Sequence, residues 1–428
     1  MYLCTSFYAN ILLMKKNLLL TVCLLAAING SAQKKDFSYK FYGQIRTDLY
    51  YNSRANQETV DGLFYMYPLD ERLDANGKDL NATANGSFYT LYTRLGVDVT
   101  GPKLGKAKTS AKVEVDFRGS GTSYSTVRLR HAYLNLDWGK SALLLGQAWH
   151  PLFGDVSPQI LNLSVGAPFQ PFSRAPQIRY QFKNKNMQLT AAAIWQSQYL
   201  SVGPNNVKSQ NYIKNSCVPE IYAGVDYKAG NWLAGAGLEL LSLKPRTEST
   251  VTIVDPVTKV EVSKTYKVDE RLTTLSYEAH VRYTNKDWFI AAKSVLGSNL
   301  TQTSMLGGYG VKSTNQWTGE QEYASILNSS SWLNVVYGQK WKPGIFLGYT
   351  KNLGTGDAVT KLYGTGTDVD QVVMAGAELT YNVAHWKFGL EYTLSSAWYG
   401  SMDASNGKIK DTHSVCNNRI VGVAMFMF

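Results

Sequence analysis

Basic side chains at alternate positions are the most conspicuous chemical feature of this sequence. Residues two apart on a β-strand point to the same face, and one face of several segments collects Arg46, Arg94, Lys112, Arg118, Arg128, Arg130, Arg179 and Lys183. Acidic side chains share it, namely Asp48, Asp98, Glu114 and Asp116. Two interpretations stay open: internal ion pairs that only keep the face polar, or a ladder of unpaired charge that guides anions.

Motifs for enzyme chemistry are missing from the sequence. It has no G-x-S-x-G elbow, H-E-x-x-H pair, phosphate-binding loop or spaced Cys/His cluster. The histidines sit singly on different expected elements, so we expect no catalytic residue, no cofactor and no metal. Residues 70–79 are acidic and could hold calcium, but their glycine comes too early for an EF-hand, and we favour a solvated loop.

The stretch HWKFGLEYTLSS, residues 385–396, shows what kind of element carries the polar side chains. Apolar residues occupy every second position, and small, polar or charged residues fill the gaps. This is the period of a strand whose two faces meet different solvents. A soluble sandwich would bury the apolar face, whereas a membrane barrel would turn it to lipid and turn the charged face to an aqueous lumen.

Charge decides between these two arrangements. In segments 38–51 and 271–284 one parity is apolar and the other carries several charged side chains. A charge that faces lipid at the middle of a bilayer costs about 2–4 kcal/mol, so the charged parity must face water. We therefore expect Lys387 and Glu391 to point into a pore.

The same periodicity recurs in sixteen segments. They are 38–51, 87–100, 108–118, 126–138, 142–149, 176–183, 187–199, 219–228, 231–243, 271–284, 287–297, 330–341, 344–352, 370–383, 386–397 and 415–428. Seven connections are short and rich in turn residues, KPG at 342–344 among them, and the other eight are mostly long. This sorting predicts an all-β fold: a transmembrane antiparallel β-barrel of 16 strands with long extracellular loops and both chain ends on the periplasmic side.

Segment 126–138 fits the alternation poorly. The parity that places Arg128 and Arg130 inward sends His131 and Asn135 outward. Either a β-bulge shifts the register, or His131 lies at a subunit interface, since an unsatisfied polar group in hydrocarbon is costly. We favour the subunit interface.

The third long connection, residues 150–176, carries many apolar side chains: Leu152, Phe153, Ile160, Leu161, Leu163, Val165, Phe169 and Phe172. A freely solvated loop would hardly expose so many. We expect this loop to fold inward and narrow the pore, with Asp155 and Arg174 as its polar lining. Packing on the outer rim or against a neighbouring subunit would satisfy the same burial argument.

Both ends of the sequence indicate export to an outer membrane. From Met14, two lysines and a short apolar run resemble a signal peptide, with cleavage near Ala32/Gln33, so we divide the chain into a leader, 1–32, and one barrel domain, 33–428. The apolar strand that ends at Phe426 and Phe428 resembles the assembly signal of Gram-negative barrels. The cysteines after the cleavage site, Cys217 and Cys416, could pair in an exported protein.

Residues 128–155 are similar to the DcaP-like porins, which are trimeric outer-membrane channels associated with small dicarboxylates and other organic anions. The resemblance rests on Arg128, Arg130, His131, Ala132 and Tyr133, and on Gly146, Gln147, Trp149, Phe153 and Asp155. It implies a homotrimer that takes up small anions passively, with Arg128 and Arg130 near the constriction.

Together these observations favour an outer-membrane porin that passes small hydrophilic solutes and prefers small anions. Expected partners are outer-membrane lipid, lipopolysaccharide, the outer-membrane assembly machinery, small solutes and two further copies of the chain. The formal charge of +11 is not clustered in a recognisable module, so we expect no nucleic-acid binding. The alternative is a non-conducting barrel that serves as a structural or adhesive surface protein.

Overall fold

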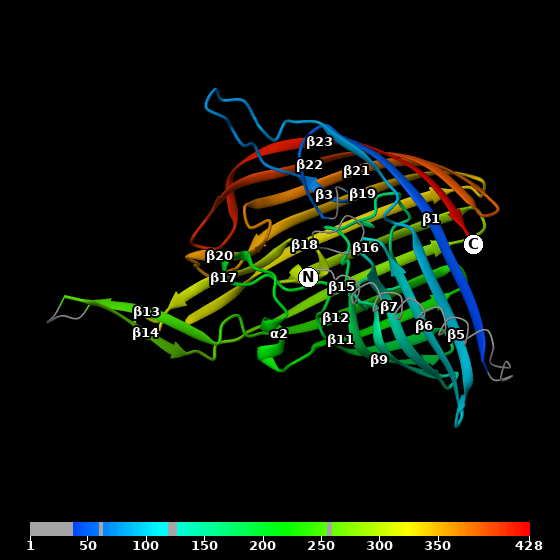
Figure 1. The fold of residues 1–428 in the computed structure, drawn as a ribbon, viewed down its shortest axis with the longest axis horizontal. Coiled ribbons are helices and arrows are strands. Elements are labelled where there is room, and N and C mark those ends of the chain that lie inside the picture. Colours follow the sequence, from blue (N-terminus) through cyan, green and yellow to red (C-terminus); the bar gives the residue numbers. More distant parts are fainter. Residues whose placement is uncertain (1–36, 60–62, 119–125, 255–258) are drawn as a thin grey trace, which may run out of the picture.

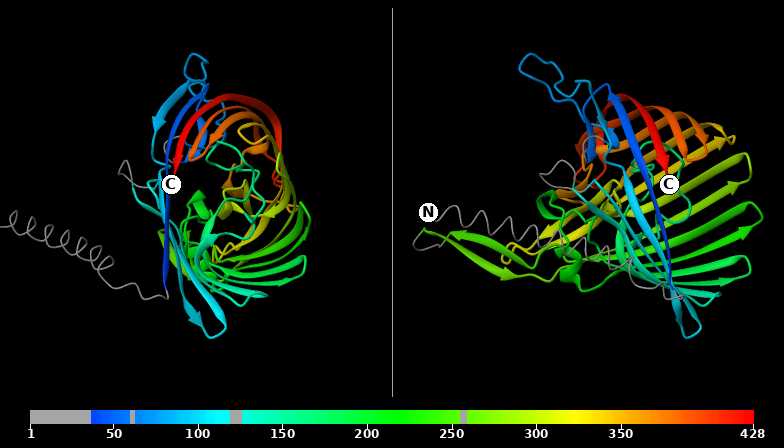
Figure 2. Two further views of the ribbon diagram at one scale, coloured as in Figure 1. Left: turned by 90° about the vertical axis from the view of Figure 1, so that its right-hand side faces the viewer. Right: turned by 45° about the vertical axis from the view of Figure 1, so that its right-hand side comes forward.

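The chain folds as a closed antiparallel β-barrel. A computed structural model describes residues 37–59, 63–118, 126–254 and 259–428, and Figures 1 and 2 show the ring of strands. The expected barrel of 16 strands is confirmed. The barrel strands are β1 (Ser38–Asn52), β5 (Arg94–Leu104), β6 (Ala107–Asp116), β7 (Arg128–Asp137), β8 (Ser141–Trp149), β9 (Arg174–Asn184), β10 (Met187–Ile194), β11 (Glu220–Ala229), β12 (Trp232–Leu243), β15 (Leu272–Thr284), β16 (Trp288–Ser298), β18 (Gln321–Tyr337), β19 (Trp341–Gly354), β21 (Val369–Val383), β22 (Trp386–Met402) and β23 (Ile409–Met427).

Shorter elements lie in the long loops at one rim of the barrel. Three strands extend the main sheet to 19 strands: β4 (Asn85–Tyr89), β17 (Gly307–Thr314) and β20 (Lys361–Thr365). Two hairpins form separate sheets, β2 (Asn56–Thr59) with β3 (Phe64–Pro68) and β13 (Glu248–Val254) with β14 (Glu261–Lys267), and the second projects far from the barrel (Figure 1). The helical turns are η1 (Pro204–Asn206), α2 (Asn211–Ser216) and η2 (Thr301–Thr303). Within the described residues, no helix has the length and apolarity needed to cross a membrane.

The first and last strands join to close the sheet. β1 and β23 pair from Gln44 opposite Met427 to Asn52 opposite Arg419. Gly43 and Phe428 exchange backbone hydrogen bonds of 2.9 and 3.1 Å. A Cβ on Gly43 would lie 2.6 Å from the Phe428 ring, so glycine lets the last residue pack against the first strand. Because of this closure, each of the sixteen barrel strands pairs with a neighbour on both sides.

Alternate side chains face opposite environments, as expected for a barrel. On β22 the outward side chains of Phe388 and Leu390 are 43% and 59% exposed. Glu391, which follows Leu390, is buried on the inner face, and the next residue, Tyr392, is exposed again. β15 follows the same rule, with Tyr277 outward and Glu278 inward. The outer surface is thus apolar and the inner wall polar, which is the arrangement that a bilayer demands.

Aromatic rings gather beside the short turns on the outer surface. Paired rings join adjacent strands there, with centroid separations of 4.7 to 4.9 Å: Trp232 with Tyr283, Trp288 with Tyr337, Trp341 with Tyr381, and Trp386 with Phe426. Rings with an apolar body and a polar edge favour the membrane–water interface. These pairs indicate where one edge of the bilayer lies.

One short turn lies elsewhere than the sequence predicts. We expected KPG at 342–344 to be the turn, but the chain reverses at residues 338–340, and Pro343 lies within β19 opposite Leu379. Gly338 adopts a φ of 101°, which suits glycine at a reversal. Pro-Gly is a common turn sequence, which explains the wrong prediction. Proline is also accepted near the end of a strand, where Pro343 points outward.

The irregularity in β7 is a β-bulge, and the expectation of a subunit contact for His131 is corrected. The register with β6 shifts between Glu114 and Val115. His131 is 8% exposed, and its ring centroid lies 5.9 Å from that of Trp149 inside the barrel. Because the bulge sends both Arg130 and His131 inward, the alternation resumes with Leu134 exposed to the outside.

The third loop, residues 150–173, folds into the barrel as expected. Phe153, Phe169 and Phe172 are buried in one apolar cluster with Trp332 and Phe346 of the inner wall. The strand β3 joins the same cluster with all its side chains buried, which sequence reasoning did not anticipate. Figure 2 (left) shows these segments inside the ring of strands.

Candidate functional site

The basic side chains lie on one part of the inner wall, contributed by β1, β5, β6, β7 and β9 and by the residues just after β6. At its centre is Tyr92, in the break between β4 and β5. Four guanidinium groups lie 4.9 to 5.6 Å from the centre of the Tyr92 ring, those of Arg46, Arg94, Arg118 and Arg130. We call these four with Arg128, Arg179 and Lys112 the arginine wall. An aromatic face attracts cations, so Tyr92 helps to hold several like charges together.

Many members of the arginine wall pair with carboxylates. Arg130 spans two of them, with Nε 2.6 Å from Glu114 and Nη1 2.9 Å from Asp116. Arg128 lies 2.6 Å from Asp116, and the remaining ion pairs are Arg46 with Asp48, Arg94 with Glu114, and Lys112 with Asp98. Ion pairing is therefore a real part of the wall, as one of the two interpretations anticipates.

Other basic side chains have no carboxylate partner in the part of the chain that the structure describes. Arg118 is 2% exposed, and its Nε and Nη2 make no hydrogen bond there. Arg179 donates instead to Gln177 Oε1 at 2.9 Å and to the carbonyl of Trp149. The basic groups of the wall outnumber its carboxylates, so the wall keeps positive charge. The anion-guiding role of this charge stays a prediction.

Arg174 does not join Asp155 in the polar lining that we expected of the third loop. Arg174 is the first residue of β9 and fully buried, with its guanidinium carbon 4.7 Å from the Trp149 ring centre. It donates to Gln198 Oε1 at 3.0 Å and to Tyr199 OH at 3.1 Å. Asp155 is exposed on the loop. Arg174 therefore anchors the loop end, and only Asp155 can contact solvent in the lumen.

Cationic side chains on β15 and β16, outside the arginine wall, hold the first part of the third loop through its carbonyl groups. Lys293 on β16 is buried and donates to the carbonyls of Leu152 at 2.7 Å and Phe153 at 2.9 Å. Arg282 on β15 donates to the carbonyl of Asp155 at 2.6 Å. Backbone groups buried in a lumen need such partners, so these side chains fix the path of the loop.

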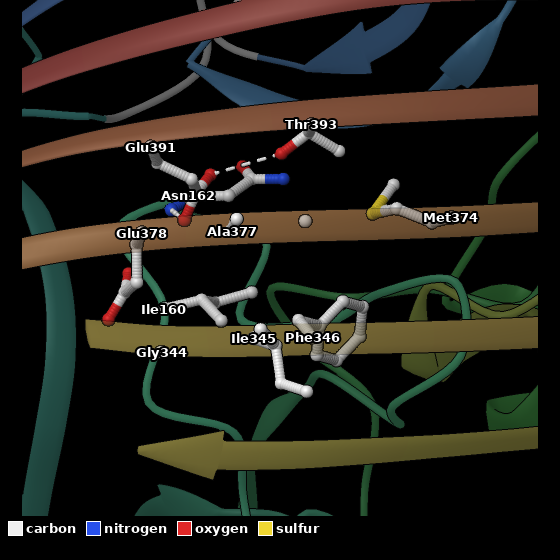
Figure 3. A pocket seen from close by; sticks show the side chains of 11 residues that line it. Ile160, Asn162, Gly344, Ile345, Phe346, Met374, Ala377, Glu378, Glu391 and Thr393 are labelled. Atoms are coloured by element: carbon white, nitrogen blue, oxygen red, sulfur yellow. Dashed lines mark hydrogen bonds between the residues drawn. The ribbon is translucent and has the colours of Figure 1, made fainter. Parts of the chain in front are cut away.

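Carboxylates on the facing strands hold the middle of the loop through its N–H groups. Leu161 N–H donates to Glu378 Oε2 at 3.0 Å and to Glu391 Oε2 at 2.7 Å, and Asn162 N–H donates to Glu391 Oε2 at 3.1 Å. Figure 3 shows the two carboxylates beside Asn162, on the adjacent strands β21 and β22, where they line a pocket with Phe346. We call Glu378 and Glu391 the carboxylate latch. The sequence placed Glu391 in the lumen but did not indicate this partner.

Small residues on the inner wall leave room for the loop. A Cβ on Gly348 would collide with the Phe169 ring, and one on Gly389 would lie 2.6 Å from Leu161 Cδ1. Glycine in a strand often marks a close approach by another segment. These two glycines, at inward positions of β19 and β22, were the available sequence signal for where the loop docks.

The remaining sequence expectations fall outside this site. In the acidic stretch 70–79, Asp74 Oδ1 accepts backbone N–H groups and Asp79 pairs with Arg54 at 3.0 Å. Within the described residues, the acidic side chains of this stretch do not bring three possible metal-ligand atoms together. Cys217 and Cys416 are both free and exposed, so the possible disulfide is not formed. The expected signal peptide and cleavage site lie outside the described residues.

Comparison with known proteins places this geometry in a family. Among solved structures, the outer membrane channel DcaP of Acinetobacter baumannii superposes with a TM-score of 0.64 and 19% identity, over 93% of this chain and 99% of that one. OmpT of Vibrio cholerae gives 0.55 and 13%, over 93% and 99%, and an anion-selective porin from Comamonas acidovorans gives 0.53 and 11%, over 92% and 100%. No curated protein matches the chain. The family model for the DcaP outer membrane protein matches residues 16–233, more than half of the sequence, and the chain therefore belongs to the DcaP family of outer membrane proteins.

Proposed function

We propose that the protein is a porin through which small hydrophilic solutes diffuse across the outer membrane. The observation that carries the proposal is the closed barrel with a polar, charged inner wall, because a lumen of this kind holds water. Membership of an outer-membrane family and the channel structures with the same fold support it. Steady ohmic current after insertion into planar bilayers is the expected result, and barrels that stay silent at all voltages would contradict it.

We further propose a preference for small anions such as dicarboxylates. Excess positive charge on a low-dielectric wall raises the local concentration of anions, and Arg118 and Arg179 have no carboxylate partner within the described chain. The porin from Comamonas acidovorans is described as anion-selective, and the sequence resemblance to DcaP-like porins points the same way. The ratio of anion to cation permeability, obtained from the reversal potential in a salt gradient, measures this preference.

Arg118→Gln is the sharper variant for selectivity. Arg128 and Arg130 pair with Asp116 and Glu114, so replacing either would also remove one partner from a buried carboxylate. Loss of Arg118 removes charge without that side effect. We expect the reversal potential to move toward the cation side, most in dilute salt where screening is weak. Lys340→Gln, in the short turn before β19, is the matched control. Equal reversal potentials in all three proteins would reject the anion ladder.

The packed interior favours one second candidate, a barrel that does not conduct. The third loop and β3 build an apolar cluster inside the barrel, and such packing could close the lumen. The protein would then serve as a structural or adhesive surface protein through its long loops and the β13–β14 hairpin. The bilayer recording described above separates the two functions directly.

Assembly is the remaining part of the proposal. We propose a homotrimer, in line with the sequence resemblance and with a solved trimer form of OmpT, surrounded by outer-membrane lipid and lipopolysaccharide. Export would use the signal peptide, and the assembly machinery would recognise the strand that ends in Phe426 and Phe428. Native mass spectrometry of the detergent-extracted protein should give the mass of three chains that begin at Gln33. A monomer, or retention of residues before 33, would contradict the respective step.

A further inference from the structure

A second polar cluster lies inside the barrel at the start of the third loop. It joins His150, which directly follows β8, to Glu220 at the start of β11 and Glu239 on β12. All three side chains are buried, at most 1% exposed. One potential ligand atom from each lies within 4.8 Å of the other two. His150 lies 70 residues before Glu220, and β11 and β12 pair as neighbouring strands, so no short spacing motif indicates the cluster.

The charges of this cluster are not balanced by nearby basic side chains. Glu220 Oε2 lies 3.0 Å from His150 Nε2. In the part of the chain that the structure describes, no lysine or arginine lies within 4.0 Å of either carboxylate. Glu239 Oε2 is buried and makes no hydrogen bond there. Two carboxylates without water or a cation are costly in such a place.

Gln302 supplies a fourth group that faces the same point. Its Nε2 lies 3.3 Å from both Glu220 Oε2 and Glu239 Oε1, and its Oε1 is buried without a partner. A half-turn of the amide exchanges these two atoms and brings the unpartnered oxygen to the carboxylates. Gln302 lies on η2, in a different loop from His150. The cluster can therefore offer one imidazole nitrogen and three side-chain oxygens.

We propose that His150, Glu220, Glu239 and Gln302 bind one divalent transition-metal ion, with Zn²⁺ as the best match. Imidazole and carboxylate groups are ordinary Zn²⁺ ligands, and four donors satisfy its tetrahedral preference. Ca²⁺ and Mg²⁺ bind through six or more oxygens and do not favour an imidazole. The double positive charge of the ion balances the two carboxylates.

Binding of the ion is coupled to the start of the third loop. Leu152 N–H donates to His150 Nδ1 at 3.2 Å, so the ring proton of the metal-free protein lies on Nε2. When Nε2 gives its lone pair to the metal, the proton moves through solvent to Nδ1, and the hydrogen bond from Leu152 is lost. The ion thus replaces one contact of the loop with a bridge from His150 to β11, β12 and η2.

The test uses the full chain purified in detergent without a polyhistidine tag. After treatment with a chelator, the protein is equilibrated with Zn²⁺, freed of unbound metal by gel filtration, and analysed for zinc by mass spectrometry. We expect about one Zn²⁺ per chain, a higher thermal unfolding midpoint for the loaded protein, and no displacement by excess Ca²⁺. Wild-type protein that holds no zinc, or zinc that Ca²⁺ displaces, would overturn the proposal.

Variants locate the ion. Glu239→Gln and His150→Gln keep the side-chain volume roughly the same and replace a carboxylate or an imidazole by a neutral amide, a weaker Zn²⁺ ligand, and we expect at least about a tenfold loss of Zn²⁺ affinity. The matched control is His413→Gln, which removes an exposed imidazole 2.6 Å from Asp70 and should bind zinc as the wild type does. Folding of each variant is checked by its heat-dependent migration in gels. Zinc binding that His413→Gln abolishes, or that Glu239→Gln and His150→Gln both retain, would show that the ion lies elsewhere and overturn the assignment.

Discussion

Arg130 links two acidic residues at the centre of the arginine wall, and its contacts are the most buried there. Its side chain is 2% exposed, and those of Glu114 and Asp116 are 6% and 0% exposed. Removing one member of a buried ion pair costs about 3–5 kcal/mol when the other member stays behind unpaired, but without Arg130 Glu114 would keep Arg94 and Asp116 would keep Arg128. We therefore expect Arg130→Gln to lower the free energy of unfolding by less than this, about 1.5–3 kcal/mol for the lost charged hydrogen bonds, measured by denaturant titration in lipid vesicles.

Arg128→Gln is the comparison for that experiment. Arg128 shares Asp116 with Arg130 but is more exposed, at 13% of its side chain. Arg130 would still neutralise Asp116 in this variant, so the loss of stability should be clearly smaller. Similar losses in the two variants would mean that Arg130 has no special place in the wall.

For single residues, the sequence predicts which face of the sheet a side chain occupies but not which side chain it pairs with. Alternation placed the basic residues on the inner wall because the period of a strand is independent of its neighbours. Pairing depends on the register between strands, and the bulge at Glu114 and Val115 changes that register locally. The same bulge turns His131 inward. In the sequence, the only indication of the bulge is the broken alternation of segment 126–138. The cluster of His150, Glu220 and Glu239 depends on the register of every strand pair from β8 to β12.

The third loop is the element whose position most affects the lumen. Its Leu161 and Asn162 N–H groups donate to the carboxylate latch, and hydrogen bonds to charged groups contribute about 1.5–3 kcal/mol each. Glu391→Ala removes the carboxylate that accepts from both residues. We expect faster hydrogen exchange at these two amides in the variant, measured by exchange mass spectrometry of the folded protein.

A matched carboxylate deletion makes that result interpretable. Glu322→Ala removes an exposed carboxylate near the start of β18. Glu378 of the latch is level with Val336, near the other end of that strand, through Gly344 of β19. Its exchange at 161 and 162 should equal that of the wild type. If Glu391→Ala also leaves both amides protected, the latch does not hold the loop.

Space on the inner wall gives a second expectation for the same loop. Gly348→Ala would put a methyl group into the Phe169 ring, and overpacking of this kind costs about 1–3 kcal/mol. We expect a lower thermal unfolding midpoint for Gly348→Ala. In Gly376→Ala the nearest atom would be Thr393 Oγ1 at 3.5 Å, an ordinary contact, so its midpoint should stay near the wild-type value. A reversed order would argue against this docking position.

Elements with strong periodicity were predictable, and those stabilised by tertiary contacts were not. The sixteen barrel strands follow from alternation, and apolar content alone indicated that the third loop is buried. β3 is buried along its whole length, so it has no alternation to detect. β17 and β20 pair with each other beyond the barrel rim, and the sequence offers no local pattern for such pairing. β18 begins at Gln321, nine residues before the segment we expected, because its first part pairs with β17 beyond the barrel rim.

The whole barrel depends on the seam between β1 and β23. Deleting Phe428 removes its two backbone hydrogen bonds with Gly43 and the ring that packs there. The same change would remove the final residue of the proposed assembly signal. We expect less folded barrel in outer-membrane fractions, measured by heat-modifiable migration. Phe428→Tyr keeps the ring and the backbone contacts and should restore the wild-type yield; a full yield from the deletion would show that the last residue is dispensable.

The partition of alternate side chains between lipid and an aqueous lumen is the claim on which the fold and the proposed function both depend. It is tested by single cysteines along β22, in a protein whose Cys217 and Cys416 are replaced by serine. In proteoliposomes, Lys387→Cys should react with a charged, membrane-impermeant thiol reagent, whereas Phe388→Cys and Leu390→Cys should be protected from it. Protection at 387 combined with reaction at 388 and 390 would contradict the account.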